Sequence, residues 1–228
     1  MKKSNSLTVS QDELEKINPI TENQKRAFNA WENGHNLILT GSAGTGKTFI
    51  ALYFAFKELL DNPDAYRKVM IMRSMVATRA AGHLPGTKDE KEEPYKGPYK
   101  NICHELFGYN GAYGKLESSQ KLQFETTSYI RGATFDQCII VVDEMQNLNF
   151  HELDSVITRV GNDCKIIFCG DYRQTDFQFD HEKSGIMKFI SIVEQMRFFR
   201  VINFGWEDIV RSDFVRDYIM TKEMLNIS

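Results

Sequence analysis

The sequence predicts an α/β fold, in which a parallel β-sheet carries helices on both of its faces. Three observations indicate this class. Short apolar runs typical of buried strands alternate with helical patterns along most of the chain. A glycine-rich segment, residues 41–48, stands between one such strand and one such helix. Later apolar runs end in acidic or amide side chains, as expected where strand ends of an open sheet form a ligand site.

Length and composition favour one folded domain. The chain has 228 residues, of which 42% are hydrophobic, so it can bury a sizeable core. We expect residues 21–228 to form a single domain and residues 1–20 to be an N-terminal extension. A net charge of −3 excludes a basic field over the whole molecule, so any nucleic-acid site must be a local patch.

The lack of a secretory signal pattern and the spacing of the cysteines predict a cytoplasmic protein. The first residues contain two lysines but lack the apolar segment of a secretory signal. No apolar run approaches the ~20 residues of a membrane span. The four cysteines form no C-x-x-C pair, which favours reduced thiols. We therefore expect the protein in the cytoplasm and away from membranes.

Residues 41–48, GSAGTGKT, fit G-x-x-x-x-G-K-[ST] at every fixed position. An apolar run at 37–40 precedes them and a helical pattern at 49–60 follows, which is the strand–loop–helix setting that this motif requires. The glycines let successive amide groups converge on phosphate oxygens, and the positive end of the helix attracts anions. We expect Lys47 to bridge the β- and γ-phosphates and the Thr48 hydroxyl to coordinate Mg²⁺. The predicted nucleotide-binding residues of this loop are Gly41, Ser42, Ala43, Gly44, Thr45, Gly46, Lys47 and Thr48.

Two helix-start signals precede the loop. S-x-x-E at 10–13 and T-x-x-Q at 21–24 fit the capping box, which predicts helices at 11–17 and 22–31. Gln24 has two interpretations. Many helicase-like ATPases place a glutamine here to read both edges of adenine, whereas the capping box predicts the same residue as a cap of its own helix. The pattern leaves both open.

A second strand at 68–72 ends in Arg73, at the edge where ligands bind in open α/β sheets. Arg73 is either a contact to phosphate or nucleic acid or a solvated surface arginine. Residues 81–115 then form an irregular excursion rich in proline and glycine. Its lysines alternate with tyrosines, a combination typical of single-strand binding. Neighbouring acidic residues largely cancel the charge, so a solvated loop that packs its own tyrosines is the alternative.

Short strands are predicted at 122–126 and 129–130, and a long apolar strand at 138–142. The last one ends in Asp143 and Glu144. Two acidic residues after a strand can form an ordinary turn, but together with the phosphate loop they predict the second half of an ATPase site. Asp143 is expected to hold Mg²⁺ through its water shell, and Glu144 to polarise the attacking water.

The remaining elements complete the sheet. They are a helix after Asn149 to about residue 160, a strand at 165–169, a helix at 184–193, a strand at 199–204 and a helix at 213–225. Gln174, which follows the strand at 165–169, is the candidate sensor of the γ-phosphate or its water. Strands that alternate with helices in this order predict a P-loop NTPase fold with a RecA-like parallel sheet.

Together these motifs resemble the PhoH-like family, phosphate-starvation-inducible ATPases related to superfamily 1 helicases. The resemblance covers about residues 21–224. It rests on GSAGTGKT, Ile130-Arg131-Gly132, VVDEMQN, GDYRQTD, Ser184-Gly185 and Asp208-Ile209-Val210-Arg211. The chain departs from the family where Ser74 replaces the proline after Arg73 and where Met145 replaces an alanine.

The resemblance implies ATP and Mg²⁺ as cofactors. It places the nucleotide site on Gln24, Gly41, Gly44, Gly46, Lys47, Thr48, Asp143, Glu144 and Gln174. It also matches Arg211 to an arginine that the family keeps after its last strand, where a contact to phosphate is expected. The expected catalytic residues are Lys47, Glu144, Gln174 and Arg211, and the expected metal ligands are Thr48 and Asp143.

Superfamily 1 helicases complete their site with an arginine from a second RecA-like core, and we expect only one core here. An arginine supplied in trans would replace it, which predicts a ring, hexameric as the resemblance suggests. The candidates are Arg211, Arg173 and Arg131. Single-stranded RNA is the expected polymer partner.

Two functions from different classes are compatible with these residues. The first is an ATPase that moves on or remodels single-stranded RNA, with helicase activity as one form of it. The alternative is a nucleotide-gated binding module with little turnover. A small-molecule kinase would need a substrate lid and acceptor-binding arginines, and the spacing of residues 170–176 argues against it. A GTPase is disfavoured because no N-K-x-D motif occurs.

Overall fold

The computed structural model describes residues 9–74, 88–127, 134–171 and 180–225. These residues form one six-stranded sheet in which every pairing is parallel. The strand order is β3-β2-β4-β5-β1-β6. The strands are β1 (Asn36–Gly41), β2 (Lys68–Arg73), β3 (Leu122–Thr126), β4 (Cys138–Asp143), β5 (Lys165–Gly170) and β6 (Phe199–Phe204).

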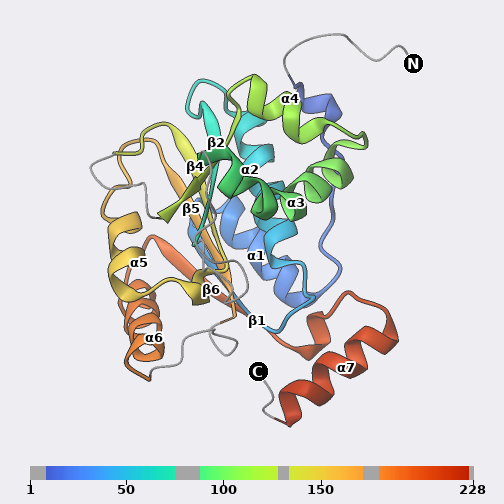
Figure 1. Ribbon diagram of the computed structural model, residues 1–228, viewed down its shortest axis with the longest axis vertical. Helices are drawn as coiled ribbons and strands as arrows, with labels where there is room; N and C mark the ends of the chain where they lie inside the picture. Colours follow the sequence, from blue (N-terminus) through green and yellow to red (C-terminus); the bar gives the residue numbers. More distant parts are fainter. Residues whose placement is uncertain (1–8, 75–87, 128–133, 172–179, 226–228) are drawn as a thin grey trace.

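Helices cover both faces of the sheet (Figure 1). One face carries α1 (Glu22–Glu32), α2 (Lys47–Asp61), α3 (Lys88–Phe107) and α4 (Ala112–Ser118), and the other carries α5 (Phe150–Ile157) and α6 (Asp180–Glu194). Side chains alternate along a strand, so Leu37 and Leu39 enter the first core and Ile38 enters the second. Because both faces are covered, the strands read as continuous apolar runs.

The last helix, α7 (Asp213–Met224), lies outside these two layers, beside the loop that follows β1 (Figure 1). Short 3₁₀ turns occur at Gln11–Glu13, Met145–Asn147 and Trp206–Asp208 among the described residues. The four cysteines have free thiols. No helix within the described ranges is long and apolar enough to cross a membrane.

The parallel sheet with helices on both faces is confirmed, and so are the strands predicted for β1 to β6. The helix expected at 11–17 is wrong, because only Gln11–Glu13 makes a single 3₁₀ turn. The reason is tertiary: the Glu15 amide donates to the Leu106 carbonyl at 2.7 Å, so the chain leaves the helical path. The short strand expected at 129–130 lies outside the described residues.

The segment expected to be irregular contains a 20-residue helix, α3, with Pro94 and Pro98 inside it. Proline removes a helical hydrogen bond and usually breaks a helix. Here the packing of one face compensates, since Tyr99, Cys103 and Leu106 are spaced at i, i+4 and i+7 and are all 0% exposed. Burial against α2 and the sheet therefore overrides the local preference.

Candidate nucleotide site

The loop after β1 takes a conformation that requires glycine. Gly41, Gly44 and Gly46 have φ angles of 116°, 73° and 81°. At Gly41 a Cβ atom would lie 2.0 Å from the Phe204 carbonyl oxygen of the neighbouring strand, which no side chain can accommodate. Gly46 in turn precedes the first residue of α2, so the loop leads directly into the N-terminus of that helix.

Lys47 is half-buried and bonds to its own loop. Its Nζ donates to the Gly41 and Ser42 carbonyl oxygens, each at 2.7 Å, and to Thr45 Oγ1 at 3.3 Å. Burial lowers the pKa of the Lys47 ammonium, and the charge of Asp171, at the end of β5, is the largest influence against that shift. The loop thus concentrates a cation and several amide groups where a phosphate chain would lie.

The acidic end of β4 is hydrogen-bonded to this loop. β5 lies between β1 and β4, yet Thr48 Oγ1 donates a hydrogen bond of 2.8 Å to Asp143 Oδ1. Asp143 is 5% exposed. Burial raises the pKa of its carboxyl and the nearby charge of Glu144 adds to the rise, whereas hydrogen bonds oppose it. Two groups separated by 95 residues in the sequence are therefore in contact.

The donors present here suit Mg²⁺. A hydroxyl and a carboxylate are hard oxygen ligands, and Mg²⁺ is usually held by one or two such protein groups together with water and phosphate oxygens. The described residues hold no cluster of three or more His, Cys, Asp or Glu that could enclose a metal without a nucleotide. Thr48 and Asp143 are the residues that would hold the ion beside a bound triphosphate.

Glu144 occupies a strained backbone position beside Asp143. Its φ of 51° and ψ of 45° are left-handed, a conformation that costs a non-glycine residue about 1–2 kcal/mol. Its carboxylate accepts a hydrogen bond from Gln146 Nε2, and Gln146 Oε1 accepts one of 3.1 Å from the Asp171 amide. A Cβ on Gly170 would lie 2.3 Å from that Gln146 oxygen. The ends of β4 and β5 are thus connected through one glutamine.

Gln24 lies at the N-terminus of α1 and is buried. Its Oε1 accepts a hydrogen bond of 2.9 Å from the Ile20 amide, an interaction of the capping type. Its neighbour Asn23 donates to Asp208 at 2.7 Å, and Asp208 follows β6 near the phosphate loop. The helix start therefore lies on the loop side of the sheet, and the contact to adenine stays a prediction.

Arg211 lies against the loop of its own chain. A Cβ on Gly44 would come within 3.0 Å of Arg211 Cγ and 3.3 Å of Ile219 Cδ1 of α7. The Val210 amide donates to the Gly44 carbonyl at 3.0 Å. The segment that leads into α7 is thus adjacent to the nucleotide loop.

Three other predicted residues, Gln174, Arg173 and Arg131, lie outside the described residues.

Sequence reasoning did not predict the contacts that three residues make at this site. Arg73 was interpreted as a ligand contact or a surface arginine, but it is half-buried against Tyr95, with its guanidinium 5.6 Å from the ring centre. Tyr99 donates a hydrogen bond to Asp143, and the charge of Asp171 raises the pKa of Lys47 against the effect of burial. For Asp171 the position at a strand end was a usable signal. No sequence pattern distinguishes Tyr99 from the other tyrosines around it.

A family model described as PhoH-like protein matches residues 16–222. The chain belongs to the PhoH-like family. It is similar to the PhoH-like protein of Mycobacterium leprae (strain TN), with 30% identity over 203 residues that cover 89% of this chain and 57% of that protein. It is also similar to Protein PhoH2 of Bacillus subtilis (strain 168), with 36% identity over 150 residues that cover 63% of this chain and 33% of that protein.

The chain spans about half the length of the curated relatives that it matches over most of its own length. Among solved structures, the Pif1 helicase from Candida albicans covers 92% of this chain with a TM-score of 0.44 and 18% identity, and 44% of that chain is matched. This likeness is too distant to bear on function. Family membership, the parallel sheet and the phosphate loop together identify the fold as that of a RecA-like P-loop NTPase.

Proposed function

We propose that this protein is an Mg²⁺-dependent ATPase that couples hydrolysis to movement on, or remodelling of, single-stranded RNA. The observation that carries the proposal is the 2.8 Å contact between Thr48 of the phosphate loop and Asp143 of β4. It brings the anion-binding loop and the acidic strand end to one point, as phosphoryl transfer to water requires.

Each residue of the site has a definite task in this reaction. The loop amides and Lys47 bind the phosphate chain, for which Lys47 exchanges its bonds to the Gly41 and Ser42 carbonyls for phosphate oxygens. Thr48 and Asp143 hold Mg²⁺, which neutralises charge that develops on the phosphates when it is bound. Glu144 orients the attacking water and accepts its proton, and its strained backbone is typical of a residue held for such a task.

The base is proposed to be adenine. Gln24 lies on the loop side of the sheet, next to the Asn23–Asp208 hydrogen bond that ties the start of α1 to the segment after β6. An amide side chain offers one donor and one acceptor group, which suits the two edges of adenine that it would read. Reading adenine requires Gln24 to exchange its present bond to Ile20.

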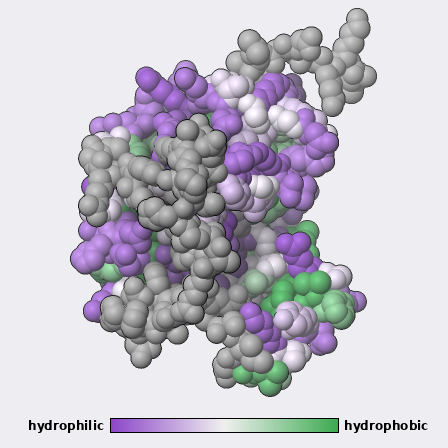
Figure 2. All heavy atoms as spheres, viewed as in Figure 1, coloured by the Kyte–Doolittle hydropathy of each residue, from purple (hydrophilic) through white to green (hydrophobic). Residues whose placement is uncertain are grey.

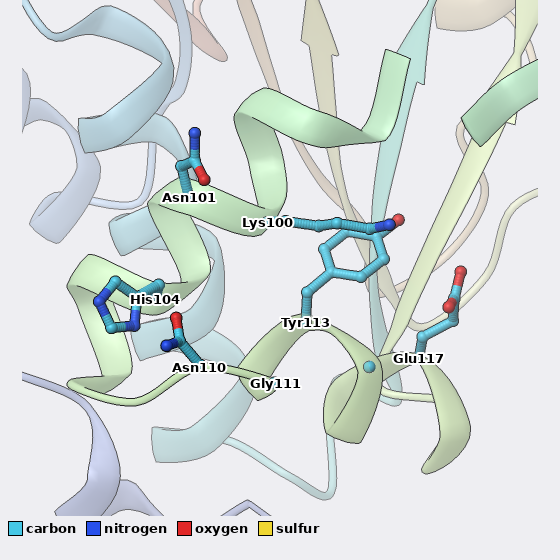
Figure 3. A pocket seen from close by; sticks show the side chains of 8 residues that line it. Lys100, Asn101, His104, Asn110, Gly111, Tyr113 and Glu117 are labelled. Carbon is cyan, nitrogen blue, oxygen red and sulfur yellow. The ribbon is translucent and has the colours of Figure 1, made fainter. Parts of the chain in front are cut away.

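The polymer partner is proposed to contact α3 and α4. A cavity of about 310 Å³ lies between these helices, lined by Lys100, Asn101, His104, Asn110, Gly111, Tyr113, Gly114 and Glu117 (Figure 3). Lys100 lies across the Tyr113 ring, 6.0 Å from its centre, and also pairs with Glu93. Basic and aromatic side chains gathered in this way support binding of a single strand, whose phosphates would compete with Glu93 for Lys100.

A homo-oligomeric ring, hexameric as the family resemblance implies, is proposed to complete the site. Exposed apolar side chains on and beside α7 support self-association (Figure 2). They are Phe214, Val215, Tyr218, Met224 and Leu225. The stem of Arg211 lies on its own Gly44. We propose that its guanidinium completes the nucleotide site of an adjacent subunit. Arg211→Ala should retain ATP binding and reduce turnover, and unchanged turnover in a monomeric preparation would argue against the ring.

The function is tested by ATP turnover measured with and without single-stranded RNA and DNA, with Lys47→Ala as the inactive control. Stimulation by RNA supports the proposal, and stimulation by DNA alone changes the polymer. Tight ATP binding with negligible turnover under all conditions favours the nucleotide-gated binding module instead. Absence of nucleotide binding would reject both.

A further inference from the structure

The carboxylate of Asp143 is held from two sides. Thr48 donates to Oδ1, and the Tyr99 hydroxyl donates to Oδ2, each at 2.8 Å. Thr48 belongs to the phosphate loop, whereas Tyr99 comes from α3 on the face of the sheet covered by helices α1 to α4. Two donors on separate oxygens fix the rotation of a carboxyl group, which is otherwise a soft torsion. The orientation of this side chain is therefore determined in part from α3.

Tyr99 is itself rigidly held. It is 0% exposed and is among the largest fully buried side chains of the described residues. Its ring lies 5.8 Å from that of Phe124 on β3. The Arg73 guanidinium interacts electrostatically with the Tyr99 hydroxyl and also lies over the Tyr95 ring, one helical turn earlier in α3. A tyrosine fixed in this way offers its proton in a single direction.

Arg73 connects this group back to the sheet. It is the last residue of β2 and is directly opposite Asp143 in the β2–β4 pairing. Arg73, Tyr99 and Asp143 therefore form a chain of polar groups next to the proposed metal site, of which Tyr99 and Asp143 are buried and Arg73 is half-buried. Polar chains of this kind are stable only when each member keeps its hydrogen-bond partners. Loss of the Tyr99 hydroxyl should therefore change the orientation of the Asp143 carboxylate.

We propose that Tyr99 is a positioning residue that orients Asp143 for Mg²⁺. The inference rests on the proposed function, because it assigns the metal to Thr48 and Asp143. By holding Oδ2, Tyr99 keeps Oδ1 directed towards Thr48, the other residue that would hold the ion. Tyr99 is not a catalytic residue, since its hydroxyl reaches the carboxylate and not the nucleotide loop. The consequence is that α3, the helix proposed to meet the polymer, also controls the geometry of the metal ligand.

The test compares Tyr99→Phe with Tyr53→Phe. Both changes remove one hydroxyl from a buried tyrosine, but the Tyr53 hydroxyl, on α2, makes no hydrogen bond within the described part of the chain. Affinity for a fluorescent ATP analogue is measured in EDTA and in Mg²⁺, and the ratio of the two affinities is the gain due to the metal. Urea unfolding of each variant checks that it is folded.

We expect Tyr99→Phe to keep the affinity in EDTA and to reduce the metal-dependent gain by roughly 10-fold, the factor that one hydrogen bond to an ionised group supplies. The Mg²⁺ concentration for half-maximal turnover should rise by a similar factor, with kcat recovering at saturating Mg²⁺. Tyr53→Phe should match the wild type. If Tyr99→Phe fails to fold, Arg73→Gln, which leaves the hydroxyl in place but removes its neighbour, should reduce the same gain.

The outcomes separate the inference from the proposed function. A gain in Tyr99→Phe equal to that of the wild type overturns the positioning role while the ATPase proposal stands. Equal losses of affinity in EDTA and in Mg²⁺ overturn it as well, because they indicate a merely structural defect. A wild-type protein with no metal-dependent gain rejects the Mg²⁺ site of the proposed function, and the inference falls with it.

Discussion

Glu223 joins helix α7 to the phosphate loop through hydrogen bonds. Its Oε2 accepts a hydrogen bond of 3.0 Å from Ser42 Oγ and one of 2.6 Å from Trp206 Nε1. None of the α7 side chains, all of which the structure describes, is fully buried. Few contacts therefore hold this helix in place, and the Glu223 carboxylate makes two of them.

Glu223→Ala should detach α7 without unfolding the domain. Loss of both hydrogen bonds is expected to weaken docking by about 2 kcal/mol, since part of their strength is already lost to water at this partly exposed position. That change corresponds to a roughly 30-fold larger open population of the helix. Global stability should be almost unchanged, because the two cores on the faces of the sheet do not depend on α7.

Hydrogen exchange measured peptide by peptide, together with urea unfolding, distinguishes these effects. Exchange across α7 should accelerate by roughly 30-fold while the midpoint of global unfolding stays within error. Asp217→Asn is the matched control, since it neutralises an exposed carboxylate on the same helix. Unchanged exchange in Glu223→Ala, or a cooperative loss of stability of the whole domain, would refute the reasoning.

Three further substitutions test other parts of the account. Glu144→Gln should bind ATP as the wild type does and reduce turnover by about 100-fold or more, the usual contribution of a general base. Turnover within a factor of ~3 of the wild type would exclude this role, because a general base supplies far more. Gly41→Ala should lower the free energy of unfolding, measured in urea, by more than about 3 kcal/mol, because its Cβ would lie 2.0 Å from the Phe204 carbonyl oxygen. A variant as stable as the wild type would show that the loop is misplaced. Asn23→Ala removes a donor from the buried Asp208 carboxylate and should cost about 1–3 kcal/mol of unfolding free energy, whereas no loss would mean that Asp208 finds another donor.

The centre of the sheet could be predicted from the sequence because local and global signals agree there. The run before Gly41 and the run before Asp143 are continuous and apolar, which is the pattern of strands covered on both faces. Parallel strands place such ends at one edge, so the contact between Thr48 and Asp143 follows from topology. The same reasoning placed Glu144 beside them.

The parts that could not be predicted depend on tertiary contacts. Pro94 and Pro98 argue locally against a helix, and only burial of one face of α3 explains why it forms. The hydrogen bond between Tyr99 and Asp143 joins residues 44 positions apart, and no periodic pattern in the sequence predicts it. Gln24 shows a different limit, because capping and adenine recognition favour the same amide at the same position.

The phosphate loop and Asp143 are proposed to meet around one metal-bound triphosphate. The most direct test is ATP affinity of the wild type and of Asp143→Asn, each measured in EDTA and in Mg²⁺. We predict that Mg²⁺ strengthens binding to the wild type, and that Asp143→Asn loses this strengthening while its affinity in EDTA is unchanged. A metal-dependent gain that persists undiminished in Asp143→Asn would contradict the account.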